Sequence, residues 1–260
     1  MANARTVLVT NDDGIDSLFL RALLEAHLQA GFEAIVAAPL QEQSWISRAL
    51  TRRGEVAVHP QNGWPCKAWA LDGTPTDCVN IALGHLLEKK PDAVISGINL
   101  GYNANLPFVL GSGTVAGALE GAFWGLPAAA YSLQLPIEQF EQIRASKGVV
   151  SGLAAESLKH AAAHAAELTA QVIEQESGRP MHAPRVHNFN FPRVTLPDTP
   201  VEDTHMGRLR QDTYFEKTPQ GTFRFKFPYS PPCDGREDTD EHCLNMRARI
   251  SHTLIDYGKL

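Results

Sequence analysis

Two adjacent carboxylates, Asp12 and Asp13, follow the apolar run at residues 6–10. Because side chains alternate across a strand, both acids can share a site only where the chain leaves the sheet and turns, and Gly14 supplies that turn. Carboxylates this close repel each other unless a cation, a proton or a basic group neutralises them, and no lysine or arginine is near in sequence. The pair therefore predicts a bound metal ion.

More oxygen-bearing side chains follow later predicted elements. Ser44 lies in the polar loop at residues 41–47, and Asn99 and Asn103 follow the apolar run at residues 91–97. Carboxylate, hydroxyl and amide oxygens suit a hard cation such as Mg²⁺ or Mn²⁺, whereas no Cys/His cluster favours zinc. The pattern predicts one divalent cation.

The run from Gly111 through Ser112 and Gly113 to Thr114 precedes a predicted helix at residues 115–123. The start of this helix offers exposed backbone N–H groups, two hydroxyls and the positive end of the helix dipole, which together suit a phosphate. A cation beside such a phosphate site indicates phosphoryl chemistry.

Each feature also has a structural explanation. A carboxylate pair at a strand end is often a solvated turn, Ser44 and Asn99 could cap or bridge loops, and a Gly-Ser-Gly-Thr run can be a tight turn. Taken singly, each is structural more often than functional. Their placement at successive strand ends favours one shared site, because a structural explanation would need several coincidences.

Other motifs carry less weight. His160 and His164 are four residues apart on a predicted helix, but the glutamate that a zincin needs after its first histidine is replaced by Ala161. Neither the dinucleotide-binding glycine fingerprint nor a phosphate loop with Gly-Lys-Ser/Thr is present. An exposed helix face is the better interpretation of the two histidines.

The scaffold that must position these residues is predicted from the hydrophobic pattern. A strand at residues 6–10, a helix at 17–30 and a strand at 33–39 favour a parallel pair with a right-handed crossover. Ligands of such sheets bind beyond the carboxyl ends of the strands, near the topological switch point. Later predicted elements are a helix capped by Thr76 or Asp77, a strand at 91–97, a helix at 115–123, a strand at 128–132, a helix at 151–176 and a strand at 185–190.

Residues 222–227 and 246–250 alternate with period two and are interpreted as antiparallel ribbons that project from the α/β core. Such a ribbon could pack on another subunit or fold onto its own core, and the pattern favours neither arrangement. A shorter hairpin is expected around residues 55–59.

Composition limits the class of protein. The chain has 260 residues, 43% of them hydrophobic and 20% charged, and a formal net charge of −6. These values describe an ordinary globule and argue against partners that are nucleic acid or anionic membrane. With no apolar signal core or spanning segment, we expect a cytoplasmic protein. Its four cysteines are too few to stabilise a fold of this size through disulfides, and they are expected to be reduced.

Several motifs together resemble those of the SurE survival-protein family. They are residues 10–15 (Thr-Asn-Asp-Asp-Gly-Ile), 73–79 (Gly-Thr-Pro-Thr-Asp-Cys-Val), 96–101 (Ser-Gly-Ile-Asn-Leu-Gly), 112–115 (Ser-Gly-Thr-Val) and 188–192 (Asn-Phe-Asn-Phe-Pro). The resemblance implies a Rossmann-like, mostly parallel α/β core with C-terminal antiparallel β-ribbon extensions. We expect the core at residues 1–192 and a ribbon and oligomerisation extension at 193–260.

The resemblance also implies roles for individual residues. The metal ligands would be Asp12, Asp13, Ser44 and Asn99, and the substrate-binding residues would be Asn103, Ser112, Gly113 and Thr114. Of these, Asp12, Asn103, Ser112 and Thr114 are the expected catalytic residues. The chain departs from the family pattern at residues 43–45, where Gln-Ser-Trp replaces the usual Arg-Ser-Gly, and in the loop at residues 104–111, which bears on the pocket entrance.

The expected function is hydrolysis of nucleoside 5'- or 3'-monophosphates to nucleoside and phosphate, with one Mg²⁺ or Mn²⁺. Asp12 would serve as a base or as the nucleophile, and the sequence does not choose between them. A homodimer or homotetramer is implied. The alternative is a non-catalytic nucleotide-sensing or phospho-receiver-like module, while a haloacid-dehalogenase-type enzyme lacks support because Asp12 and Asp13 adjoin instead of forming Asp-x-Asp.

Overall fold

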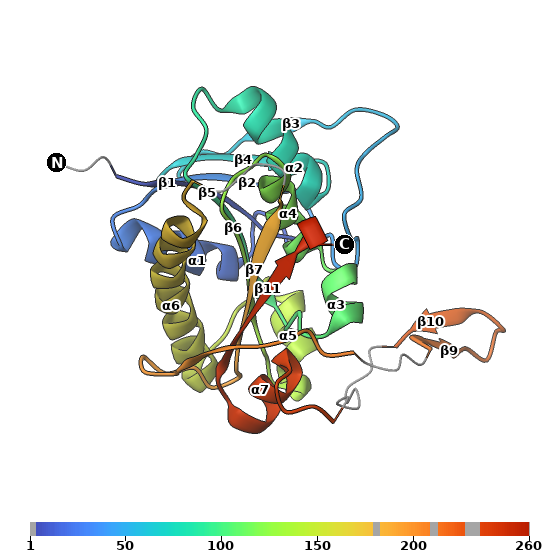
Figure 1. Cartoon of the computed structure of the whole chain (residues 1–260). Coiled ribbons are helices and arrows are strands. Elements are labelled where there is room, and N and C mark those ends of the chain that lie inside the picture. The colour runs from blue at the N-terminus through green and yellow to red at the C-terminus, as the bar shows by residue number, and fades with distance from the viewer. Residues whose placement is uncertain (1–3, 179–182, 209–212, 227–234, 260) are drawn as a thin grey trace.

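The computed structural model describes residues 4–178, 183–208, 213–226 and 235–259. Its centre is a nine-stranded sheet in the order β3-β4-β2-β1-β5-β6-β7-β11-β8 (Figure 1). The six strands from β4 to β7 run parallel, and β3 and β11 are antiparallel to their neighbours β4 and β7. The strands are β1 (Thr6–Thr10), β2 (Glu33–Pro39), β3 (Val58–Pro60), β4 (Lys67–Leu71), β5 (Ala93–Leu100), β6 (Ala128–Leu133), β7 (Arg185–Phe191), β8 (Val201–Asp203) and β11 (Ile250–Asp256). The predicted mostly parallel α/β fold is confirmed.

The strand order reverses between β1 and β5. From β1 the chain proceeds outward through β2 to β4, and from β5 it proceeds in the other direction through β6 to β7. The carboxyl ends of β1 and β5 are therefore the two sides of a topological switch point, where α/β proteins bind ligands.

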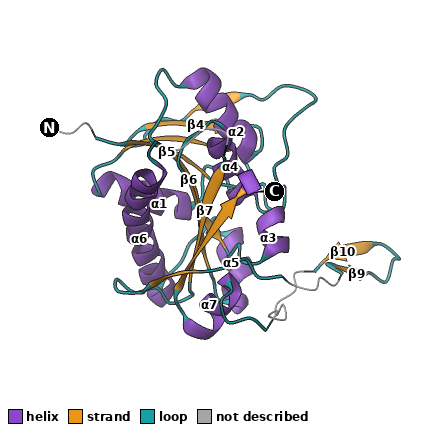
Figure 2. Cartoon of the chain, viewed as in Figure 1, coloured by secondary structure: helices purple, strands orange, loops and turns teal. Residues whose placement is uncertain are grey.

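Helices cover both faces of the sheet (Figure 2). Alternate residues of β1 show the two layers, because Val7 and Val9 pack with α1 and α6 whereas Leu8 packs with the layer of α2. The helices are α1 (Leu18–Gln29), α2 (Pro75–Ile81) continued by the π-helical turn η1 (Ala82–Leu86), α3 (Leu106–Gly111), α4 (Gly113–Phe123), α5 (Phe140–Ala145), α6 (Gly152–Glu176) and α7 (Asp240–Arg247), with short 3₁₀ turns η2 (Ile137–Gln139) and η3 (Tyr257–Lys259).

Helix α4 approaches the sheet closely through three glycines spaced four residues apart. A Cβ on Gly117 would lie 2.8 Å from Thr10 Cγ2, and a Cβ on Gly113 would lie 2.8 Å from Asp12 Cβ. A Cβ on Gly121 would overlap Val94. The small residues thus bring the start of α4 against the end of β1.

The start of α2 differs from the prediction. Thr74, and neither Thr76 nor Asp77, is the N-cap, and its hydroxyl accepts the N–H of Asp77 at 3.1 Å. The Asp77 carboxylate in turn accepts the backbone N–H of Thr74 at 3.0 Å, and the two hydrogen bonds form a capping box. Pro75 at the first helical position fixes this earlier start.

The C-terminal prediction is confirmed for one segment and wrong for the other. Strands β9 (Phe215–Lys217) and β10 (Phe223–Phe225) form an antiparallel ribbon that projects from the core (Figure 1). Residues 246–250 form no ribbon, because α7 ends at Arg247 and Ala248 adopts the left-handed conformation before β11 begins. The period-two pattern there belongs to a helix end and a turn.

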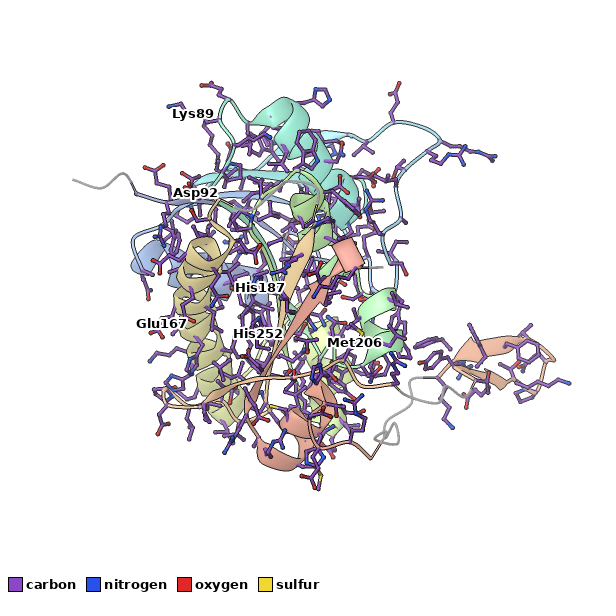
Figure 3. All side chains as sticks on the ribbon, in the orientation of Figure 1. Lys89, Asp92, Glu167, His187, Met206 and His252 are labelled. Atoms are coloured by element: carbon purple, nitrogen blue, oxygen red, sulfur yellow. The ribbon has the colours of Figure 1, made fainter. Side chains whose placement is uncertain are left out.

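Strand β11 pairs along its length with β7 inside the central sheet. The rings of His187 on β7 and His252 on β11 stack with centroids 5.1 Å apart (Figure 3). Strands β8 and β11 thus extend the sheet, and the division of the chain at residue 192 stays a prediction.

Two further expectations concern cysteines and membranes. Cys66, Cys78 and Cys243 are free thiols, and Cys233 lies outside the described residues. Within the described ranges, no helix combines the length and apolar character needed to cross a bilayer.

The packing of α4 predicts that Gly121→Ala destabilises the protein. The added methyl would overlap Val94, and overpacking of this kind costs about 1–3 kcal/mol. Gly84→Ala is the matched control, because its Cβ would lie 3.6 Å from Trp124 in ordinary contact. Urea unfolding of both variants gives the measurement, and a Gly121→Ala protein as stable as the wild type would contradict the account.

Candidate active site

Asp12 and Asp13 lie just beyond β1, each held by a hydrogen bond from another element. Thr114 Oγ1, in the first turn of α4, donates to Asp12 Oδ1 at 2.5 Å. The backbone N–H of Leu100, at the end of β5, donates to Asp13 Oδ2 at 3.0 Å. Gly14 makes the turn with φ +93°, where an added Cβ would lie 3.2 Å from the backbone of Gln41. The switch point thus fixes both acids.

The two carboxylates carry uncompensated charge. Asp12 is only 3% exposed, and among the described residues neither acid forms an ion pair with lysine or arginine. Burial raises the pKa of Asp12 to about 6, against the lowering effect of the Thr114 hydrogen bond. Burial, and then the charge of Asp12, raise the pKa of Asp13 well above its ordinary range. The site therefore favours uptake of a cation or a proton.

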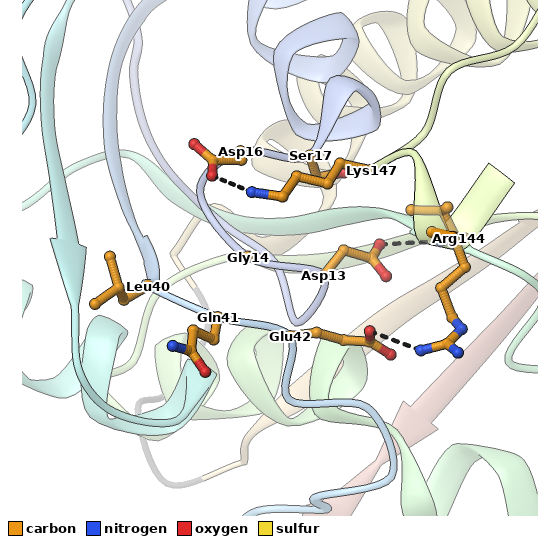
Figure 4. A pocket seen from close by; sticks show the side chains of 11 residues that line it. Asp13, Gly14, Asp16, Ser17, Leu40, Gln41, Glu42, Arg144 and Lys147 are labelled. Carbon is orange, nitrogen blue, oxygen red and sulfur yellow. Dashed lines mark hydrogen bonds and ion pairs between the residues drawn. The ribbon is translucent and has the colours of Figure 1, made fainter. Parts of the chain in front are cut away.

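Glu42 adds a third negative charge that the sequence analysis missed. Its charge contributes to the raised pKa values of both Asp12 and Asp13. Arg144 forms an ion pair with Glu42 at 3.1 Å, and both side chains line the pocket that contains Asp13 (Figure 4). This small pocket has a volume of about 300 Å³.

The remaining predicted metal ligands lie in a larger adjoining pocket. Ser44 and Asn99 line it together with Asp12, and its volume is about 590 Å³. Ser44 Oγ donates to Glu42 Oε1 at 2.8 Å, and Asn99 Nδ2 donates to the carbonyl of Gly101 at 2.8 Å. The Oδ1 atom of Asn99 is thus the amide atom that can act as a ligand.

The predicted phosphate-site residues divide into two groups. Asn103 and Ser112 line the larger pocket, whereas Gly113 and Thr114 are buried beside Asp12. Ser112 is the N-cap of α4 and accepts the N–H of Val115 at 3.1 Å. The structure therefore places the Thr114 hydroxyl on the carboxylate of Asp12, the candidate base or nucleophile, and the Ser112 hydroxyl at the pocket wall.

Asn103 is positioned by the Asn-x-Asn segment of β7. Its backbone N–H donates to Asn190 Oδ1 at 2.7 Å, and its carbonyl accepts Asn188 Nδ2 at 2.8 Å. Its side-chain amide donates to Ser132 Oγ on β6 at 2.9 Å. These three hydrogen bonds come from strands that are distant from Asn103 in sequence. The motif at residues 188–192 was a signal for the two asparagines on β7, whereas no sequence pattern pointed to Ser132.

Five aromatic side chains also line the larger pocket. Helix α3 supplies Phe108 and helix α5 supplies Phe140, while Phe225 comes from the projecting ribbon and Trp45 and Tyr102 from loops. Sequence analysis identified none of them as site residues, because each is an ordinary core or surface aromatic until the fold brings them together.

The donor set fits a hard divalent cation. The larger pocket offers the carboxylate of Asp12 with the neutral oxygens of Ser44 and Asn99, and Asp13 lies next to Asp12 on the adjoining pocket. Such oxygen donors are the ligand chemistry of Mg²⁺ and Mn²⁺. Across the described part of the chain, no group of three or more His, Cys, Asp or Glu side chains could hold a metal. A nitrogen- and sulfur-rich zinc site is thus not offered there.

Comparisons with known proteins find relatives over most of the chain. The proteins named 5'-nucleotidase SurE from Methanocella arvoryzae and Xanthomonas euvesicatoria are 33% and 35% identical to this chain, over 96% of it in each case and over 91% and 88% of their own lengths. The protein of the same name from Nitratidesulfovibrio vulgaris is 40% identical over 74% of this chain and 63% of its own.

A solved structure and a family model point the same way. The SurE protein from Aquifex aeolicus matches with a TM-score of 0.72 and 25% identity, covering 96% of this chain and 93% of that one. The model of the family described as survival protein SurE matches residues 7–216. Because this match spans most of the sequence, the chain belongs to the SurE family.

Proposed function

We propose that this protein is a metal-dependent phosphatase that hydrolyses nucleoside 5'- or 3'-monophosphates to nucleoside and phosphate. The observation that carries the proposal is a single pocket lined both by the buried carboxylate of Asp12, which forms no ion pair with a lysine or arginine of the described residues, and by five aromatic side chains. A nucleoside monophosphate has matching halves, an anionic phosphate and a planar base. Relatives named 5'-nucleotidase support this assignment.

Asp12, Asp13, Ser44 and Asn99 would hold one divalent cation, Mg²⁺ or Mn²⁺. When bound, the cation would neutralise the phosphoryl oxygens and polarise the phosphorus. The raised pKa values of the two acids support this assignment, because a bound cation would offset first the desolvation of the carboxylates and then the repulsion between them.

The start of α4 would bind the rest of the phosphate. Ser112 uses an acceptor site for Val115 N–H, so its own O–H can donate to a phosphate oxygen. The side-chain amide of Asn103 has two N–H bonds, of which Ser132 receives one. The backbone N–H groups and dipole of α4, with Gly113 at its first turn, add to this positive potential.

Asp12 would deprotonate the attacking water or attack phosphorus itself. Thr114 orients the Asp12 carboxylate through their hydrogen bond, which is the role we assign to this threonine. Acid quenching during turnover followed by a search for phosphoaspartate separates the two routes, since only direct attack forms that adduct.

We also propose a homodimer or homotetramer. Phe215 and Phe223 of the ribbon are 54% and 69% exposed, and such apolar side chains suit burial against a second copy. Sedimentation analysis of the full chain gives the mass.

The central activity prediction is loss of phosphate release on removing the metal or its main ligand. With AMP and Mn²⁺, Asp12→Asn should lower kcat by about 10²-fold or more, because both metal binding and acid–base chemistry depend on this carboxylate. EDTA should abolish turnover and added Mn²⁺ or Mg²⁺ should restore it.

The matched control is Asp198→Asn, which changes an exposed acid outside both pockets and should retain wild-type turnover. Full activity of Asp12→Asn, or of protein freed from metal, would refute the mechanism. Nucleotide binding without any turnover in the wild type would favour the sensor module.

A second prediction concerns stability without metal. The pKa of Asp12 is about 6 in the fold against an ordinary 3.8, so the folded state binds more protons than the unfolded state between these values. Stability from this group therefore falls as pH rises through this window, by up to about 3 kcal/mol. EDTA-treated Asp12→Asn should unfold at higher urea concentration than wild type at pH 7.5.

The advantage of Asp12→Asn should shrink toward pH 4, where the wild-type carboxyl is protonated. Adding Mn²⁺ should stabilise only the wild type, because binding to the folded state alone raises its stability. A variant that is less stable than wild type at every pH would contradict the charge repulsion inferred for this site.

A further inference from the structure

Trp45 has a backbone conformation that is rare for a bulky residue. Its φ is +61°, in the left-handed region that favours glycine, and Ser47 two residues later has φ +54°. A hydrogen bond from Ser47 N–H to the carbonyl of Gly111, at 3.0 Å, fastens this loop to the end of α3. Strained residues of this kind persist where the surrounding structure holds them, and they cluster at ligand sites.

Packing fixes the indole of Trp45 at the wall of the larger pocket. A Cβ on Gly111 would lie 3.1 Å from indole Cε3, so the absence of a side chain there makes room for the ring. The ring centroids of Phe108, Tyr214 and Phe225 lie 5.6, 5.5 and 5.4 Å from that of Trp45. Even so, Trp45 is 41% exposed and lines the cavity.

The indole of Trp45 lies close to both the proposed metal ligands and the proposed phosphate site. Trp45 directly follows Ser44 on the proposed metal side, and it packs on Gly111, which directly precedes Ser112 on the proposed phosphate side. A ligand whose phosphate is bound by these groups would therefore have the indole close by, on the wall of the same pocket. Base–aromatic stacking is strong and tolerates every nucleobase, because each base has a π-face.

We propose that Trp45 is the stacking platform for the nucleobase, and that it makes the enzyme select nucleoside monophosphates over phosphate esters without a base. This inference rests on the proposed phosphatase function and names the group that recognises the rest of its substrate. Because stacking uses the face of the indole, aromatic replacement should preserve the selection and aliphatic replacement should remove it.

The test compares AMP with ribose 5-phosphate, which has the same sugar and phosphate but no base. Trp45→Leu should lower kcat/KM for AMP about tenfold or more while changing that for ribose 5-phosphate less than about twofold. Trp45→Phe should retain most of the preference for AMP. Calorimetric titration with adenosine, which has no phosphate, should show a matching loss of affinity in Trp45→Leu.

Trp64→Leu is the matched control. The guanidinium of Arg21 lies 4.2 Å from the centroid of this ring. Trp64 precedes β4, at the amino-terminal end of the strand, whereas the site lies beyond the carboxyl ends of the strands. The control should leave both esters and adenosine binding unchanged.

Two results would overturn the inference. An equal loss for AMP and ribose 5-phosphate in Trp45→Leu would show that the indole only supports the Ser44 loop. An unchanged AMP preference would show that the base binds elsewhere. If the wild type releases phosphate from no ester, the proposed function fails. Adenosine binding then tests the role of Trp45 separately: binding that is absent, or that Trp45→Leu leaves unchanged, would overturn the inference.

Discussion

A buried carboxylate, Asp12, and a partly buried one, Asp13, stand side by side without a basic partner among the described residues, and this sets the conditions that the rest of the site must meet. β1 places Asp12 and Asp13 at the switch point, and hydrogen bonds from Thr114 and Leu100 hold them there. The hydrogen bonds that these carboxylates accept do not offset their desolvation, so the pKa of each acid is raised. Stability and function therefore oppose each other at this point in the fold.

Close packing explains how phosphate chemistry can be placed beside that charge. Gly113 has no side chain where one would collide with Asp12, so the positive end of α4 reaches the end of β1. Asn103 is fixed from the other side by Asn188 and Asn190 on β7. The sheet thus brings cation-binding and anion-binding groups together from segments that are far apart in the chain.

Much of this arrangement could be predicted from the sequence, because parallel strands deliver their polar tips to one edge. That rule placed Asp12, Ser44, Asn99, Asn103 and Ser112 around one site, and the structure puts all five on one pocket. It could not show that Thr114 contacts Asp12, or that Glu42 and the aromatic side chains of the larger pocket belong to the site, because these contacts depend on tertiary packing. Period-two patterning was misleading at residues 246–250, since a short helix end and a turn can also alternate.

The most direct measurement is the location of the metal itself. Diffraction data collected at the manganese absorption edge from crystals of the Mn²⁺-loaded protein show each ion as an anomalous peak. One peak per chain is expected between the carboxylates of Asp12 and Asp13, with an oxygen of Ser44 or Asn99 also in the coordination sphere. The absence of a peak at this position in the loaded protein, or a single peak elsewhere, would contradict the proposed metal site.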